Sequence, residues 1–183
     1  MNCLRLLTFC CFCLLFACTN SDLETENDQS VERFFDLSQY FKGQVKLLAT
    51  KQEVQKKASI NGKTESKTIS TPDFKQELQL FIDSDINRTS WLDKYEVDST
   101  RNATGNLTQL TYTALEDKLR TRKVAITFTN KEVTNVEILN ATDNVIAQTK
   151  QELSYTPQQG YVIKSFQDIL LAEPRTMEVA VNF

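Results

Sequence analysis

Apolar side chains recur at helical spacing before residue 50 and at strand spacing along most of the chain after it. Between residues 34 and 48 they return every three or four positions, which is the period of an amphipathic helix. Ser30 precedes this stripe and suits an N-cap, while Gly43 inside it lowers helix propensity by about 1 kcal/mol relative to alanine. We therefore predict a first helix over 30–48 that buries its apolar side.

The next segment has the pattern of a β-hairpin. Two strand-like runs, Val54–Ile60 and Lys63–Ile69, flank Asn61-Gly62, and both turn residues tolerate the positive φ of a two-residue hairpin turn. A loop of this length pairs Ile60 with Lys63. Five lysines are expected to keep an edge strand soluble, with contact to an anionic surface as the alternative: Lys51, Lys56, Lys57, Lys63 and Lys67.

A second helix and a long series of strands complete the pattern. Thr71 and Pro72 suit the cap and first turn of a helix that ends near Asp83. Alternating positions then predict strands over 95–100, 107–115, 120–130, 132–141, 145–155, 161–171 and 177–183. Short connections between such strands are typical of an antiparallel meander. The sequence predicts a single α+β domain over 30–183: an N-terminal helix, a β-hairpin and a second helix, followed by a curved antiparallel β-meander.

The cysteines mark a segment of a different kind. All five lie within the first eighteen residues, around an apolar run from Leu6 to Ala17 that Thr8 alone interrupts. Such a run is short for a bilayer span, which takes about 20 residues, but it fits the apolar core of a secretory signal. The run ends at Cys18, and the chain then becomes polar at once.

Leu15-Phe16-Ala17-Cys18 resembles the lipobox of bacterial lipoproteins. The resemblance implies that residues 1–17 are a signal peptide and that Cys18 carries acyl chains, such as palmitate, which anchor the protein in a membrane. Thr19 follows the cysteine where inner-membrane retention would need aspartate, so we expect the outer membrane, at its periplasmic face or the cell surface. An ordinary secretory signal or an uncleaved signal anchor is the alternative.

Residues 18–29 are polar and acidic after the cysteine, and we expect them to form a disordered tether. The acidic cluster is also similar to the one that directs some Bacteroidota-type lipoproteins to the cell surface. A plain spacer and an export signal are therefore both open.

Composition excludes several functional classes. The chain has no histidine, which excludes Ser-His-Asp and Cys-His catalysis and histidine-ligated zinc. Its four scattered glycines leave no phosphate-binding loop, and its formal net charge of −3 argues against nucleic acid as a partner. We expect no cofactor and no metal.

Acidic residues remain as candidates for chemistry. Asp83, Asp85 and Asn87 match the first three ligand positions of a calcium loop. Arg88 and Lys94 occupy the positions where that loop needs glycine and glutamate, so a helix end with side-chain caps is the simpler interpretation. A glycosidase needs two facing carboxylates, and three pairs are candidates: Asp83 with Asp85, Glu96 with Asp98, and Glu116 with Asp117.

Aromatic residues allow two interpretations. Those after residue 90 suit either a sugar-stacking platform or the core, and the core is the more common role: Trp91, Tyr95, Tyr112, Tyr155 and Tyr161. Those on the first helix suit either the core or a partner-binding groove: Phe34, Phe35, Tyr40 and Phe41.

A further set of residues is similar to a motif of small outer-membrane lipoproteins of Bacteroidota type, which have no assigned activity: Glu77-Leu78, Phe81, Asp85-Ile86-Asn87, Trp91 and Tyr95. This resemblance implies location and fold but no catalytic site. We predict a lipid-anchored binding or assembly module without catalytic activity, which docks to an envelope protein or holds an apolar ligand in a half-barrel pocket. The alternative is a carboxylate-dependent envelope hydrolase acting on glycan.

Overall fold

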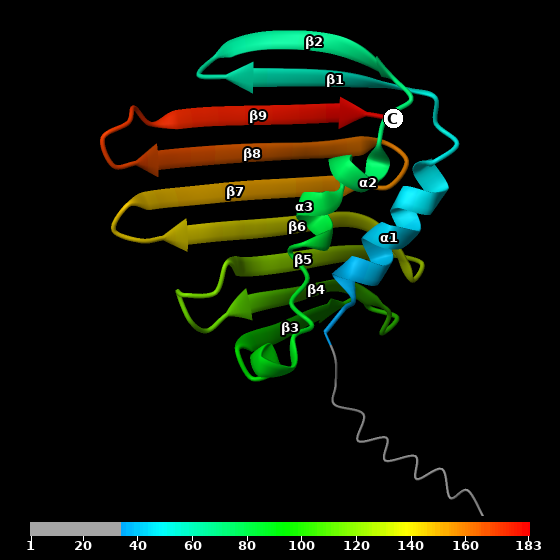
Figure 1. The fold of residues 1–183 in the computed structure, drawn as a ribbon. Helices are drawn as coiled ribbons and strands as arrows, with labels where there is room; N and C mark the ends of the chain where they lie inside the picture. The colour runs from blue at the N-terminus through cyan, green and yellow to red at the C-terminus, as the bar shows by residue number, and fades with distance from the viewer. Residues whose placement is uncertain (1–33) are drawn as a thin grey trace, which may run out of the picture. The chain divides into compact units, whose positions relative to one another are not determined.

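The computed structural model describes residues 34–183, and all of them belong to one compact unit. A single nine-stranded sheet has the order β2-β1-β9-β8-β7-β6-β5-β4-β3, and every neighbouring pair is antiparallel (Figure 1). The strands are β1 (Glu53–Ile60), β2 (Lys63–Ser70), β3 (Tyr95–Arg101), β4 (Leu107–Ala114), β5 (Thr121–Thr129), β6 (Glu132–Asp143), β7 (Ala147–Thr156), β8 (Gly160–Ile169) and β9 (Arg175–Asn182). The helices are α1 (Leu37–Leu48), α2 (Phe74–Glu77), α3 (Gln79–Ile82) and the single 3₁₀ turn η1 (Thr89–Trp91).

All three α-helices lie on one face of the sheet (Figure 1). Alternate residues of the strands point to that face and form the core together with the helices. Val124, Ile138 and Leu153 oppose one another across β5, β6 and β7 in this way. The residues between them point to the other face, which no helix within 34–183 covers.

The hairpin prediction is confirmed to the residue. Ile60 opposes Lys63 and Val54 opposes Ile69. The turn residues Asn61 and Gly62 have φ of 46° and 82°, the left-handed conformations that a tight hairpin turn requires. β2 is an edge of the sheet and carries Lys63 and Lys67, as predicted, whereas Lys56 and Lys57 lie on β1, which has a neighbour on both sides.

The antiparallel meander is also confirmed, with strand ends that differ from the prediction by a few residues. The sequence did not indicate that β1 pairs with β9, which joins the hairpin to the meander in one continuous sheet. The molecule is therefore β-rich with a few short helices, and the predicted α+β class is confirmed only in this coarser form.

The predicted helix boundaries need correction. Asp36, not Ser30, caps α1, since its carboxylate accepts a hydrogen bond from the Gln39 amide at 2.7 Å; Ser30 lies outside the described residues. The predicted cap Thr71 is wrong as well, because Thr71 adopts a φ of 51° and the side chain of Asp73 caps α2. Among residues 34–183 the helices are too short or too polar to cross a membrane.

Candidate binding site

The predicted lipidation site lies outside the described residues. Cys18, the signal peptide over 1–17 and the tether over 18–29 all precede Phe34, where the described chain begins. Their roles stay predictions.

The segment that resembles a calcium loop fastens the start of α1. One carboxylate oxygen of Asp85 accepts the amide of Leu37 at 3.1 Å, and the other accepts the amide of Asn87 at 3.3 Å. The Asn87 side-chain amide donates to the carbonyls of Phe34 and Phe35 at 3.2 and 3.1 Å. The side chains of Asp85 and Asn87 therefore hold the chain at the start of α1, as side-chain caps do.

The other residues of this segment point to different partners. Asp83 is exposed and accepts from the Gln79 side chain at 2.8 Å. Ser84 is buried, donates to the Leu80 carbonyl and accepts from the Asn140 side-chain amide at 2.8 Å. No group of three or more acidic, cysteine or histidine side chains that could hold a metal ion occurs among residues 34–183.

The remaining carboxylate pairs lie on the surface. Glu96 and Asp98 are exposed on β3. Glu116 lies between Lys118 and Lys94, and its hydrogen bonds to these two amines lower its pKa to about 2. Asp117 pairs with Arg122 at 3.1 Å and is fully exposed. A glycosidase acid needs a raised pKa, whereas the pKa of Glu116 is shifted the other way.

The aromatic residues are mostly core. Tyr95, Tyr112, Tyr155 and Tyr161 are buried, as are Phe34 and Phe41 on and before α1. Trp91 is half-buried, with the Arg88 guanidinium 4.4 Å from the centre of its ring. The core interpretation is therefore confirmed for the four tyrosines and for these two phenylalanines.

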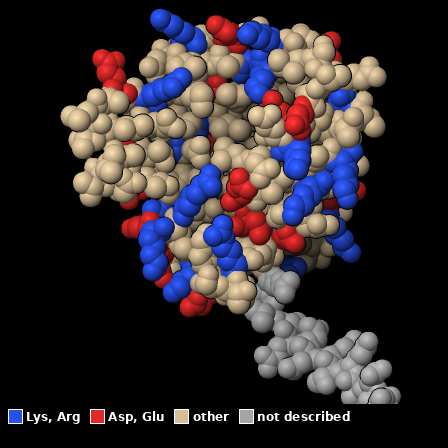
Figure 2. Space-filling model, in the orientation of Figure 1, with Lys and Arg blue, Asp and Glu red and all other residues tan. Residues whose placement is uncertain are grey.

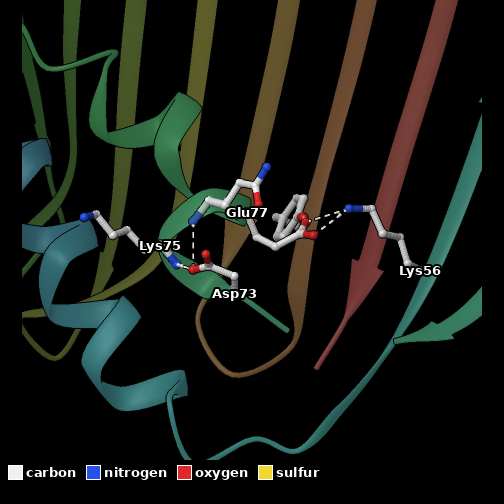
Figure 3. A network of polar contacts seen from close by, with 6 residues as sticks. Lys56, Asp73, Lys75 and Glu77 are labelled. Carbon is white, nitrogen blue, oxygen red and sulfur yellow. Dashed lines mark hydrogen bonds and ion pairs between the residues drawn. The ribbon is translucent and has the colours of Figure 1, made fainter. Parts of the chain in front are cut away.

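A polar cluster joins α2 to the sheet (Figure 3). Glu77 extends from the end of α2 and accepts two hydrogen bonds from the Lys56 ammonium of β1, at 2.6 and 2.8 Å. The Tyr161 hydroxyl of β8 donates to the same carboxylate. The pKa of Tyr161 lies far above its usual value, mainly because the hydroxyl is buried and also because it is hydrogen-bonded to Glu77. Lys56 and Tyr161 both bond to the Glu77 carboxylate, so the cluster fixes α2 in place.

Most of the residues from which the sequence analysis inferred a resemblance to outer-membrane lipoproteins have structural roles. Leu78, Phe81 and Ile86 are fully buried, and Glu77, Asp85 and Asn87 make the contacts that hold α2 and α1. Such residues support a fold and leave the site of action open.

A hollow of about 480 Å³ lies on the opposite face of the sheet, over β5 to β8. Its floor consists of small and apolar side chains of the outward-pointing set, namely Ala125, Leu139, Ser154 and Val162, and its rim is charged, namely Lys123, Glu137, Glu152 and Lys164. We call this the sheet hollow. Its volume is within the range of about 300–1,000 Å³ that is typical of small-molecule sites.

The rim carries charges of both signs, and further charged residues adjoin it. Lys164 opposes Glu152 on one side and Glu178 on the other. Lys150 pairs with Glu152 at 2.7 Å, and this hydrogen bond lowers the pKa of Glu152. A second hollow of about 350 Å³ shares Glu152 and Lys164 with the first and continues toward Phe166 and Thr176. The two hollows therefore adjoin each other on the uncovered face.

Sequence reasoning missed this surface. The signal was present in the strand alternation, since Leu139 and Val162 stand at positions that a solvated face would fill with polar residues. Only the cross-strand register shows that these side chains meet.

Comparison with known proteins adds no assignment: no family model, no curated protein and no solved structure matches the chain.

Proposed function

We propose that the protein is a binding module of the bacterial cell envelope without catalytic activity, anchored in the outer membrane by acyl chains on Cys18, and that it holds an apolar or amphipathic ligand. The sheet hollow is the observation that carries the proposal. It combines an apolar floor with a charged rim, which suits a molecule with an acyl or other apolar part and a polar head.

The place of the ligand differs from the one first expected. A half-barrel pocket closed by a helix would lie between α1 and the sheet, but Phe41, Phe81 and Tyr155 fill that space as core. The proposal therefore places the ligand on the face of the sheet that the helices leave uncovered.

Mass spectrometry tests the ligand. Residues 19–183 purified from cells without detergent are compared under native and denaturing conditions. We expect an added mass in the native spectrum alone. The variant Leu139→Lys places a charge on the floor of the hollow and should lose that mass, whereas Val97→Lys, at an exposed apolar position of β3, should keep it.

Two results contradict the proposal: a bare protein in the native spectrum, or an added mass that Leu139→Lys retains. A bare protein would direct attention to an envelope protein as the partner.

Fractionation tests the anchor. Full-length protein should sediment with the outer membrane, and Cys18→Ser should move it to the soluble fraction, since a protein without acyl chains lacks the anchor. Cys13→Ser is the matched control and should leave the protein in the membrane. Sedimentation of Cys18→Ser with membranes at the level of the unchanged protein would refute lipidation at Cys18.

A further inference from the structure

Two neighbouring turns at one end of the sheet expose a cluster of aliphatic side chains. The β6–β7 turn carries Val145 and Ile146, and the end of β8 and its turn carry Ile169, Leu170 and Leu171; we call these five residues the apolar tip. Val145 is 94% exposed and Leu171 is 99% exposed. Isolated exposed aliphatics are common on protein surfaces, but five on two adjacent turns and the neighbouring strand end form a patch.

The two turns are fastened to each other. The Leu170 amide donates to the Ile146 carbonyl at 2.8 Å, and Ala147 pairs with Ile169 in the ladder between β7 and β8. The apolar tip is therefore one surface. Figure 2 shows the corresponding lobe, at the left, largely free of charged side chains.

Much of the tip backbone is paired within the chain. The Asn144 side chain accepts the amides of Ile146 and Ala147, each at 2.9 Å, and the Ala172 amide donates to the Ile169 carbonyl at 2.9 Å. A peptide N–H that enters hydrocarbon without a partner costs several kcal/mol. The amides of Ile146, Ala147, Leu170 and Ala172 are therefore satisfied within the chain, so most of the backbone donors of the tip need no partner from outside.

The charges around the tip are set back from it. Segments 144–147 and 169–172 contain no charged residue, while Asp143, Asp168 and Glu173 flank them. These acids limit the depth to which the tip can enter an apolar phase.

Leu171 also adopts an unfavourable backbone conformation. Its φ of 66° lies in the left-handed region, which is strained for a bulky side chain. Its side chain is fully exposed, so packing within the described domain does not offset the strain. An exposed leucine held in this way is consistent with a surface shaped for an external contact.

We propose that the apolar tip inserts into a lipid bilayer, beside and independently of the acyl chains expected on Cys18. A projecting set of aliphatic chains needs no complementary pocket in an acyl phase. Protein interfaces, in contrast, depend mostly on Trp, Tyr and Arg anchors, and the tip contains none of these. The inference goes beyond the proposed ligand site and does not rest on it.

The test uses the absence of cysteine from residues 19–183. Leu171→Cys is labelled with the environment-sensitive dye NBD, and Leu47→Cys on α1, where the native leucine is also exposed, is the matched control. On addition of phosphatidylcholine vesicles, we expect the emission at position 171 to rise severalfold and shift to the blue. The label at position 47 should not respond.

Vesicle flotation of unlabelled protein tests the same point by affinity. Leu170→Asp should weaken binding about tenfold or more, because a charge then replaces an inserted aliphatic chain, and Leu47→Asp should leave binding unchanged. Circular dichroism confirms the fold of each variant.

Three results would overturn the proposal. One is a label at position 171 that stays in water when vesicles are present. Another is flotation of Leu170→Asp at the level of the unchanged domain. The third is a blue shift that depends on protein concentration without vesicles, which would assign the tip to contact between two copies.

Discussion

At the residue scale, tyrosine hydroxyls connect strands of the sheet with one another and with the segments packed on the sheet. The Tyr155 hydroxyl donates to the Gln44 side chain of α1 at 2.8 Å, and the Tyr112 hydroxyl accepts the Phe35 amide at 3.0 Å. Tyr161 donates to Glu77, and Tyr95 donates to the Thr121 carbonyl at 2.8 Å. Each ring is buried while its hydroxyl has a partner, which is the usual arrangement for core tyrosines.

These environments predict a loss of stability at high pH. Burial raises the pKa of Tyr40 and of Tyr95 to about 12, and it also raises the pKa of Tyr112, Tyr155 and Tyr161. Above pH about 10 the unfolded chain releases phenolic protons that the folded chain retains, so the free energy of unfolding falls as pH rises. Below that pH the contribution is fully present.

The ultraviolet absorbance of phenolate measures this effect. We expect the absorbance to stay low past the ordinary tyrosine pKa and then to rise together with the loss of circular dichroism. A gradual rise centred near pH 10 in the folded protein would contradict the prediction.

The Glu77 cluster allows a paired comparison of two ion pairs. Glu77→Gln removes the charge that holds Lys56, whose side chain is only 30% exposed, and should lower the free energy of unfolding by about 1–3 kcal/mol. Glu65→Gln on β2 is the control, because its contact with Lys67 is 4.0 Å long and highly exposed, and should change stability by less than about 0.5 kcal/mol. Urea denaturation measures both. Equal effects would show that the Glu77 contacts are as weak as a surface pair.

At the element scale, local signals predicted the strands better than the helix ends. Asn61-Gly62 specifies both a turn and a register, so the first hairpin followed directly from the sequence. The helix caps did not, because Ser30 and Thr71 are as suitable by residue type as Asp36 and Asp73. Tertiary contacts decide between them: α1 begins where Asp85 and Asn87 fasten the chain.

Two glycines in different elements predict opposite responses to the same substitution. Gly160 starts β8 with a φ of 151°, and a Cβ there would collide with the carbonyl oxygen of Val181 on β9. Gly160→Ala should therefore lower the free energy of unfolding by about 2 kcal/mol or more. Gly43 lies in α1 with open space around its Cα, so Gly43→Ala should raise it by about 0.5–1 kcal/mol.

Thermal and urea denaturation of the two variants check the signs. Stabilisation by Gly160→Ala, or destabilisation by Gly43→Ala, would contradict the described packing at that position.

At the scale of the whole molecule, the sequence predicted the meander but neither of the candidate surfaces. Val145, Ile146, Leu170 and Leu171 looked like ends of strands, whereas β7 begins at Ala147 and β8 ends at Ile169, which leaves them in the turns. Periodicity shows to which face of the sheet a side chain points, but it does not show whether other elements bury that face. Whether Leu139 lies in the core or on an open face depends on which side of the sheet the helices occupy.

Local sequence patterns also could not predict that β1 pairs with β9. Its register places Gln55 opposite Asn182, and both strands look complete in isolation, since each has another antiparallel neighbour. A short stretch of sequence carries no signal for a contact between positions so far apart along the chain.

That pairing also sets an order of events during biosynthesis. A chain that leaves a ribosome or a translocation channel from its N-terminus presents β1 early and β9 last, so β1 must wait for its partner while the intervening strands emerge. Until then the hairpin keeps an unpaired edge, and the sheet beneath α2 is incomplete. The closing of the sheet is therefore a late step, which only a nearly complete chain can take.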